Sequence, residues 1–458
     1  MENFNFKEWV YNCMLSKLYR EEDGKNIYSG NLSYIFLSMT AIAIYTAWGF
    51  NRIFTPFIEI NGFGLSDAFS GLILGLEGLV GIFADPISGF LADRRFLYPH
   101  DTRGIMIVTS IIVMFSMVVL IPYATSVNEL IALLIALYIS AHFMRTPYNS
   151  LMPKTFEMKN WGVASGYINS FLAMGSIVAF LLVAGFETKI GIKNTALIEG
   201  MVIIVTGVIT PLIVKEKMPE EREIVVKDKK TLGKKVSLMF RDRRILIYFL
   251  IQFFSWVAYE SIAIYFVSYV DSAGYSFTSS KGGALVFAAV GFAIFNLITF
   301  LSSIPLGIAY RKMRNKKNMM IYGLLLLTIT MLFASTYRTM DLVMIYLAVG
   351  GLAWGTFLVS SYPIGAFLIT SLEGDREAAL SSFFGLSAFF NNLALLTAAV
   401  GISFILTISS NNFEFMFLAS AICATISIIL VLMLKIDNFI LSKVESSDIR
   451  EILPMEEQ

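Results

Sequence analysis

Five ionisable residues interrupt long apolar stretches of this sequence: Arg52, Glu77, Asp85, Arg145 and Glu260. An ionised side chain in hydrocarbon costs roughly 2.5–3.5 kcal/mol on insertion scales, so each of them needs a polar partner or a water-filled space. A buried acid without a partner takes up a proton, and a buried guanidinium can hold an anionic or polar solute. The chemistry that these residues suggest is the binding of protons and small solutes within a membrane.

Polar neighbours accompany these charges at helical spacing. Residues three or four positions apart share one face of a helix. Three such faces hold Tyr45, Trp48, Arg52 and Thr55, with Asn51 beside them; Glu77, Gly81, Asp85 and Gly89; and Tyr138, His142, Arg145 and Asn149. Lipid cannot satisfy such groups, so we expect these faces to turn toward a shared polar interior.

The apolar stretches that carry these faces are long enough to cross a membrane. Hydrophobic residues make up 56% of the 458 residues and charged residues only 15%, whereas a soluble domain has about 45–50% and about 25%. A helix needs about 20 apolar residues to span the hydrocarbon core. Twelve runs qualify, at 33–58, 68–92, 104–124, 128–152, 161–186, 196–214, 245–270, 282–309, 319–337, 341–370, 378–408 and 413–435. The sequence therefore predicts an all-α integral membrane protein with twelve transmembrane helices.

The loops between these helices differ in positive charge. Cytoplasmic loops carry an excess of Lys and Arg. One set of loops, which includes both ends of the chain, holds most of these residues, and the other set holds only Lys189, Lys193, Lys281 and Arg338. We therefore expect a multi-pass protein of the cell membrane, without a signal peptide, whose N- and C-termini are cytoplasmic.

A polar stretch near the middle divides the chain into two halves of six predicted helices. The halves echo each other, because Gly307 and Pro363 follow Gly89 and Pro147 at nearly the same separation. Secondary transporters are often built from such repeats, with the substrate site between them. The expected segments are a cytoplasmic N-terminal segment at 1–30 with an amphipathic helix that ends near Gly24, a six-helix bundle at 31–214, a cytoplasmic linker at 215–244, a second bundle at 245–437 and a cytoplasmic tail at 438–458.

Other classes of function find little support in the composition. A formal charge of +1 gives no bulk basicity for nucleic acid. Cys13 and Cys423 lie at opposite ends of the chain, so we expect no disulfide framework and no zinc site, and with only two histidines His-rich metal chemistry lacks ligands. A membrane enzyme needs a nucleophile with a base, and only His142 is available as the base. We expect no nucleic-acid partner, no metal, no cofactor and no enzymatic activity, and we expect a monomer. A sensor without transport activity is the less favoured interpretation, because such proteins usually add a long soluble domain.

The seventh apolar stretch adds an acid to a group of aromatic rings. Glu260 has no obvious cation at membrane depth in its own half of the chain, so it is a candidate proton carrier. Rings with polar handles suit a solute such as a sugar, and those at this depth are Trp256, Tyr259, Trp354 and Tyr362. A structural interpretation stays open, in which the rings only pack and Asp85 pairs with Arg145 to fix the helices.

Several of these residues stand in motifs that resemble those of a known family. The pattern G-x-x-x-D-R from Gly89 to Arg94 resembles the start of the loop after the second helix in the major facilitator superfamily. The preceding Asp85-Pro86 resembles the Asp-Pro pair of the cation-coupled glycoside symporters in that superfamily. Three stretches resemble the related disaccharide proton symporters, namely Trp48 to Phe57, Arg145 to Pro153 and Ala258 to Ser261. The resemblance covers the first five helices best and implies two pseudo-symmetric six-helix bundles that rock about a central site.

The resemblance also implies roles for single residues. It makes Asp85 and Glu260 the cation-coupling acids and Asp93 with Arg94 a cytoplasmic latch, in which a carboxylate caps a neighbouring helix. The implied gating residues are Gly89, Asp93, Arg94, Gly307 and Arg311. Sodium-coupled members have an acid and a polar residue where this chain has Gly81 and Ala84, which favours a proton. Lys154 replaces an acid that is usual in the disaccharide branch, so that gate contact departs from the family pattern.

The function expected from the sequence is proton-coupled import of a sugar or glycoside by alternating access. The expected solute-binding residues are Asn51, Arg52, His142, Arg145, Tyr148, Asn149, Trp256, Tyr259, Trp354 and Asn391. The alternative is a facilitator for organic anions or amphiphilic lipids, because Arg52 and Arg145 can hold a carboxylate or a phosphate.

Overall fold

The computed structural model of the protein describes residues 19–22, 25–28, 31–65, 67–94, 101–156, 158–214, 236–276, 283–371, 380–410 and 412–436. The strands are β1 (Tyr19–Glu22) and β2 (Lys25–Tyr28). The α-helices are α2 (Asn31–Phe57), α3 (Asp67–Arg94), α4 (Thr102–Leu120), α5 (Val127–Asn149), α6 (Leu151–Thr155), α7 (Trp161–Ile190), α8 (Ile192–Gly207), α9 (Ile209–Ile213), α12 (Arg243–Ala263), α13 (Phe266–Ser272), α14 (Gly283–Lys312), α15 (Lys317–Thr336), α16 (Met340–Thr370), α17 (Leu380–Ile408) and α18 (Glu414–Met433). A π-helical turn, η2 (Ile58–Gly62), follows α2, and the 3-10 turns η3 (Ile121–Tyr123) and η4 (Met158–Asn160) follow α4 and α6.

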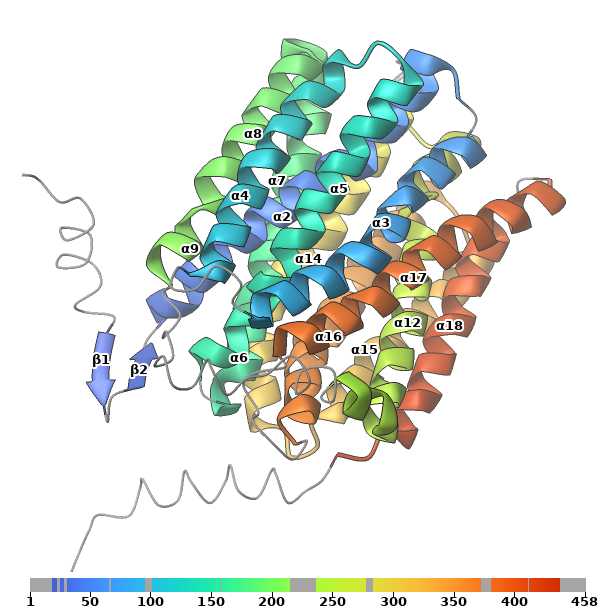
Figure 1. Ribbon diagram of the computed structural model, residues 1–458. Helices are drawn as coiled ribbons and strands as arrows, with labels where there is room; N and C mark the ends of the chain where they lie inside the picture. The colour runs from blue at the N-terminus through green and yellow to red at the C-terminus, as the bar shows by residue number, and fades with distance from the viewer. Residues whose placement is uncertain are drawn as a thin grey trace, which may run out of the picture.

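Twelve candidate membrane spans are present among the described residues. Each of them coincides within a few residues with a run predicted from the sequence; the second covers Phe69–Asp93 and the eleventh Leu380–Ile408. Figure 1 shows these long helices running side by side. The predicted all-α membrane fold with twelve helices is confirmed.

The segment before the first long helix differs from the prediction. Where the amphipathic helix was expected to end, β1 and β2 form an antiparallel hairpin in which Tyr19 pairs with Tyr28 and Glu22 with Lys25. The apolar residues at helical spacing stop at Leu18, and the next ones favour a hairpin through aromatic and opposite-charge cross-strand pairs. The rest of the expected helix, at 1–18, lies outside the described residues, as do 215–235 of the expected linker and the whole expected tail.

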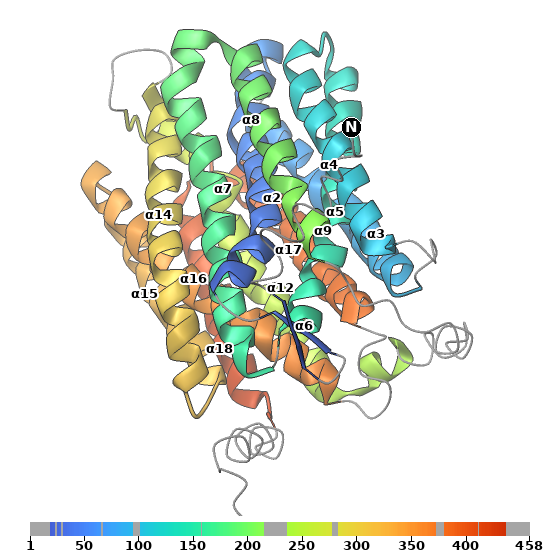
Figure 2. The same cartoon turned by 90° about the vertical axis from the view of Figure 1, so that its left-hand side faces the viewer.

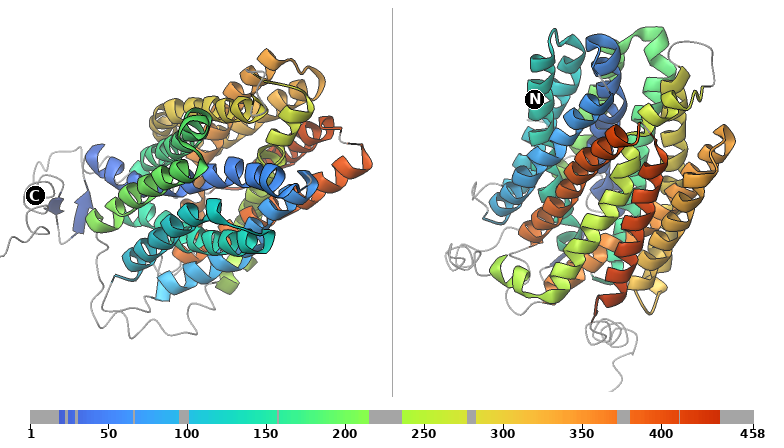
Figure 3. Two further views of the ribbon diagram at one scale, coloured as in Figure 1. Left: turned by 90° about the horizontal axis from the view of Figure 1, so that it is seen from above. Right: turned by 90° about the vertical axis from the view of Figure 1, so that its right-hand side faces the viewer.

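The first half of the chain, α2 to α9, meets the second half, α12 to α18, along two pairs of long helices. The most extensive contacts between helices join α3 to α17 and α7 to α14 (Figures 1 and 2). The right-hand view of Figure 3 shows the blue and cyan helices on one side and the yellow, orange and red helices on the other. Helix α3 begins at Asp67, close to Glu59, and ends at Arg94, next to Asp93. We therefore call the two ends of the bundle the Glu59 end and the Asp93 end.

Small residues allow these helices to approach closely. Gly89 of α3 faces the carbonyl oxygen of Ser381 in α17, and Gly307 of α14 faces that of Gly162 in α7. Small residues at such crossings let helix backbones pack together where lipid offers no hydrophobic driving force. Arg311, one turn beyond Gly307, is exposed near the end of α14.

Two neighbouring glycines of α16 test this packing. A methyl group at Gly350 would lie 3.5 Å from the ring of Phe295, an ordinary contact, whereas one at Gly351 would overlap the carbonyl oxygen of Phe295. Alanine is preferred to glycine inside a helix by about 0.5–1 kcal/mol. We therefore expect Gly350→Ala to maintain or raise the melting temperature of the purified protein and Gly351→Ala to lower it by several degrees. Equal effects of the two substitutions would contradict this packing.

Candidate functional site

A cavity of about 610 Å³ lies between the two halves, near the middle of the long helices. Helices α2, α3, α5 and α7 of the first half and α12, α14, α16 and α17 of the second half supply its walls. The charged and amide side chains in the wall are Arg52, Glu77, Arg145, Glu260, Asn296, Asn391 and Asn392. The polar faces expected from the sequence on α2, α3 and α5 each contribute to this one space.

Arg52, Glu77 and Glu260 form what we call the central charge cluster. Arg52 Nη2 lies 3.0 Å from Glu260 Oε2 and 3.6 Å from Glu77 Oε2. The cation that Glu260 lacks in its own half thus comes from the first half, 208 positions earlier. Glu77 and Glu260 are 4% and 3% exposed. One guanidinium group that serves two carboxylates leaves an excess negative charge, which one proton can neutralise.

Asn51 lies behind the central charge cluster. It is fully buried, and its Nδ2 donates a hydrogen bond to Glu77 Oε2 at 3.4 Å. Its Oδ1 accepts hydrogen bonds from Thr55 Oγ1 at 3.0 Å and from Tyr138 OH at 3.1 Å. The structure therefore places Asn51 where it orients Glu77 rather than on the cavity wall.

Asp85 and Arg145 form the second charged group, which we call the Asp85 cluster together with Thr146 and Asn392. Arg145 Nη2 donates to Asp85 Oδ2. Thr146 Oγ1 donates to Asp85 Oδ1 and Asn392 Nδ2 donates to Asp85 Oδ2, each at 2.7 Å. Asp85 is fully buried, whereas Arg145 reaches the cavity. Donors from α5 and α17 satisfy both oxygens, so this carboxylate joins α3 to both helices.

Two residues of α5 that were expected to bind solute are buried away from the cavity wall. His142 is fully buried, with Nδ1 at 2.9 Å from Asp85 Oδ2. Tyr148 is 1% exposed, and its hydroxyl donates to the carbonyl oxygen of Leu37 at 2.9 Å. Both share a helix with Arg145, but the cavity wall contains neither of them.

Aromatic rings form the part of the wall that belongs to α12 and α16. Tyr259 stacks on Trp354 with ring centroids 4.6 Å apart and an angle of 8° between the planes. Trp256 meets Trp354 edge to face at 5.2 Å, and its Nε1 lies 3.2 Å from the amide of Asn391. Across the cavity, Arg145 lies over the ring of Trp48 at 5.2 Å. Flat apolar faces thus alternate with hydrogen-bonding groups.

A pocket of about 440 Å³ continues the cavity toward the Asp93 end. It shares several residues with the cavity and adds Asn149, Leu172, Tyr362, Phe384 and Ser387. Asn149, which was expected to bind solute, is therefore placed on the same path at a different depth from Trp354.

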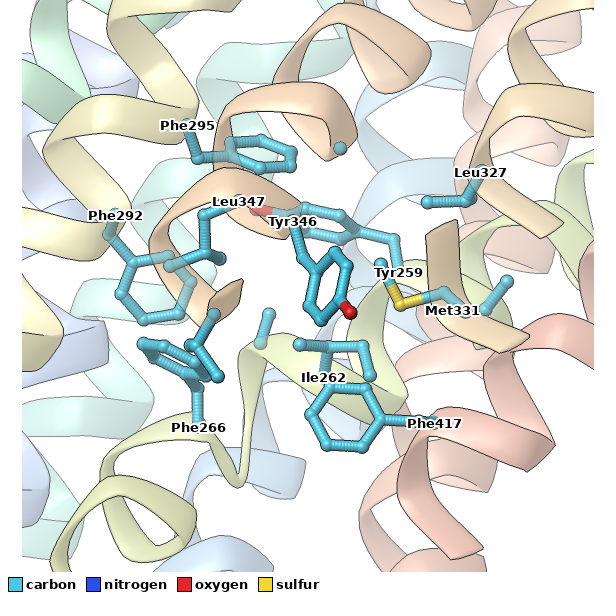
Figure 4. Close-up of a pocket in the computed structure, with 14 residues that line it drawn as sticks. Tyr259, Ile262, Phe266, Phe292, Phe295, Leu327, Met331, Tyr346, Leu347 and Phe417 are labelled. Atoms are coloured by element: carbon cyan, nitrogen blue, oxygen red, sulfur yellow. The ribbon is translucent and has the colours of Figure 1, made fainter. Parts of the chain in front are cut away.

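A third pocket, of about 540 Å³, lies within the second half behind Tyr259. Figure 4 shows Tyr346 among the aromatic and aliphatic side chains that line it, which include Phe266, Phe292 and Phe417. Tyr259 belongs to the wall of both this pocket and the central cavity. An apolar space thus adjoins the polar site.

Asp93 connects the two halves at its end of the bundle. Its Oδ2 accepts hydrogen bonds from the backbone N–H and the hydroxyl of Ser382 at 2.7 and 2.8 Å, and its Oδ1 accepts from the backbone N–H of Ser381 at 3.3 Å. A carboxylate here complements the positive N-terminal end of α17. Its cation is Arg103, which lies 3.1 Å away and is 2% exposed. The side chain of Arg94 lies outside the described residues.

Neutralising Asp93 tests this connection. Asp93→Asn preserves the size of the side chain but removes the negative charge that lies 3.1 Å from the buried Arg103, which is costly. We expect the melting temperature of the purified protein to fall by several degrees. The control is Asp341→Asn, because Asp341 is exposed at the start of α16, and it should leave the melting temperature nearly unchanged. Similar losses in both variants would argue against a special role for Asp93.

Four buried polar or charged residues were not among the site residues predicted from the sequence. Arg103 stands just before the predicted run at 104–124, and Asn392 is an uncharged residue within the run at 378–408. Glu199 of α8 is fully buried with neither carboxylate oxygen hydrogen-bonded within the described part of the chain. Glu199 interrupts an apolar run, so the same signal that identifies Arg52 applies to it. Glu59 follows directly after a predicted run and escaped the search for that reason.

The comparison with known proteins agrees with this arrangement. A search of the curated proteins found no match. Residues 36–394 match the profile of the Major Facilitator Superfamily, and this match extends from α2 into α17. It covers most of the chain and all or part of every helix that lines the cavity. The chain therefore belongs to the major facilitator superfamily of membrane transporters.

Proposed function

We propose that the protein carries a neutral polyhydroxyl solute, a sugar or a glycoside, across the membrane together with a proton. The observation that supports this most is the charge balance of the cavity wall. Arg52 and Arg145 are each held by carboxylates, and the rest of the wall offers aromatic rings and amides. Such a wall suits stacking and hydrogen bonding to a neutral solute.

Proton coupling is supported by the central charge cluster. Glu77 and Glu260 share Arg52, so a proton on either acid brings the cluster to neutrality. Glu260 lines the cavity, where its charge affects a bound solute directly. We therefore propose Glu260 as the proton carrier. Asp85, whose oxygens are satisfied by donors, is proposed to hold the helices and to release Asn392 when the halves separate.

Alternating access is supported by contacts between the halves at different depths. Arg52 meets Glu260 beside the cavity, and Asp93 meets Ser382 at the Asp93 end. If the halves rock about the cavity, these contacts cannot all persist in both orientations. We propose that the Asp93 end faces the cytoplasm of a monomer in the cell membrane, because the loops rich in Lys and Arg connect helices at that end, and that the solute is imported.

The second candidate function is transport of organic anions or amphiphilic lipids. It is favoured by the apolar pocket behind Tyr259, which can take the apolar part of an amphiphile. An anionic group would, however, compete with Glu260 and Asp85 for the two guanidinium groups. Since both carboxylates are close and buried, we rank this candidate second.

Binding and proton movement separate the two candidates. The purified protein is screened by thermal shift against neutral sugars and glycosides, organic acids and lysophospholipids. We expect stabilisation by a neutral sugar or glycoside, and we expect that solute to alkalinise the medium outside proteoliposomes as protons enter with it. Stabilisation by acids or lysophospholipids alone, without movement of protons, would favour the second candidate.

A further inference from the structure

Glu59 is a fully buried carboxylate in η2, at the end of the bundle opposite Asp93. The hydroxyl of Ser70, from α3, donates a hydrogen bond to Glu59 Oε2. Glu59 Oε1 is also buried and has no hydrogen-bond partner among the described residues. A buried charged oxygen without a donor is costly, and a proton on the carboxyl group removes that cost. The site therefore favours a proton-binding acid.

The groups around Glu59 supply no described cation at ion-pair distance. Ser70 is its partner on α3, Thr55 lies one helical turn earlier on α2, and Tyr138 of α5 is within electrostatic reach. Burial raises the pKa of Glu59 to about 8, although the hydrogen bond from Ser70 opposes the shift. We therefore expect Glu59 to gain or lose its proton near pH 8.

Several buried polar side chains lie between Glu59 and the central charge cluster. Thr55 and Asn51 stand four and eight positions before Glu59, on the same face of α2. The hydroxyls of Thr55 and Tyr138 donate to Asn51 Oδ1 at 3.0 and 3.1 Å. Asn51 Nδ2 in turn donates to Glu77 Oε2 at 3.4 Å. These hydrogen bonds join Thr55 and Tyr138 to Glu77 through Asn51, and Thr55 stands one helical turn before Glu59. The side chains involved are nearly all fully buried.

We propose that Glu59 is the proton acceptor at this end of the transporter and that it supplies the central charge cluster. This inference rests on the proposed proton coupling. The carboxylate of Glu59 binds one proton from water, and the same acid then gives one proton to the carboxylate of Glu77. No other bond is made or broken overall, and the hydroxyls of Thr55 and Tyr138 lie along the route. Glu59 thereby sets the external pH at which uptake is driven.

The first test replaces Glu59 by glutamine, which preserves its shape and removes its proton site. Initial uptake driven by a proton gradient is measured in proteoliposomes across a series of external pH values. Wild-type uptake should decline as the external pH rises through about 8. In Glu59→Gln we expect uptake to fall at least about tenfold and to lose this decline. Exchange of solute at equal pH on both sides should be unchanged.

Two matched variants distinguish a proton route from simple damage to the fold. Ser70→Ala removes the hydrogen bond that opposes the raised pKa, so the decline in uptake should move to higher pH. Tyr138→Phe retains the ring but removes a hydroxyl of the route, so uptake should slow while the midpoint of the decline stays in place. A variant that only destabilises the protein would reduce uptake and exchange equally at every pH, and this result for both variants would overturn the inference.

Thermal stability provides a readout that does not depend on transport. The ordinary pKa of a glutamate is about 4.5, and that of Glu59 in the folded protein is about 8. Between these values the folded state binds more protons than the unfolded state, so this residue makes stability fall as pH rises. Glu59→Gln should remove that part of the fall. Identical pH profiles of stability for both proteins would contradict a buried proton site at Glu59.

The outcomes also separate this inference from the proposed function. If the wild-type protein moves no protons with its solute, proton coupling and the inference fall together. If the wild-type protein couples and Glu59→Gln retains the wild-type dependence of uptake on external pH, only the inference falls.

Discussion

Glu260→Gln is expected to abolish the uphill accumulation of solute while solute exchange continues. The glutamine preserves the size and a hydrogen-bond acceptor for Arg52, but it cannot gain or lose a proton. Among the described residues, Arg52 then keeps one carboxylate, that of Glu77 at 3.6 Å, and the cluster becomes neutral without a proton. The measurement compares gradient-driven uptake with exchange at equal pH in proteoliposomes.

The control for this prediction is another glutamate that pairs with an arginine. Glu414 of α18 pairs with Arg338 near the Glu59 end, and the side chain of Glu414 is 43% exposed. Glu414→Gln therefore removes the same charge from a site outside the cavity and should leave accumulation intact. Full proton-driven accumulation by Glu260→Gln would eliminate Glu260 as the proton carrier.

Asp85→Asn is expected to remove transport and to lower stability strongly. Asp85 is fully buried and receives donors from Arg145, Thr146 and Asn392. Removal of one partner from a buried ion pair typically costs about 3–5 kcal/mol, because the other charge remains uncompensated. Unfolding in increasing denaturant measures the loss of stability, and initial uptake rates measure the loss of transport.

A double substitution shows whether this loss comes from the pair. Arg145→Gln in the Asp85→Asn background removes the remaining charge, so we expect much of the lost stability to return while transport stays absent. The two single losses should therefore combine with strong non-additivity, as expected for residues in contact. Additive losses would mean that Asp85 and Arg145 act independently, contrary to the contact described here.

Local sequence patterns were sufficient to predict the helices and the polar faces on them. Backbone groups in hydrocarbon must be satisfied within a helix, so a run of about 20 apolar residues predicts a span with little help from the rest of the chain. The repeat of 3.6 residues likewise groups His142, Arg145 and Asn149 on one side of α5. Only the first segment escaped this logic, because the pairing of Tyr19 with Tyr28 replaces helical periodicity there.

The partners of the charged residues were decided by the tertiary structure. Periodicity gives the face of a helix on which a side chain lies, but it does not give the helix that lies opposite. Glu260 therefore appeared to lack a cation until the packing of the two halves brought Arg52 to it. In the same way, only the approach of α17 to α3 gives Asn392 and the N-terminal end of α17 to Asp85 and Asp93. The apolar composition of each helix follows from its contact with lipid. The partner of each charged residue, in contrast, depends on contacts between residues that can be hundreds of positions apart.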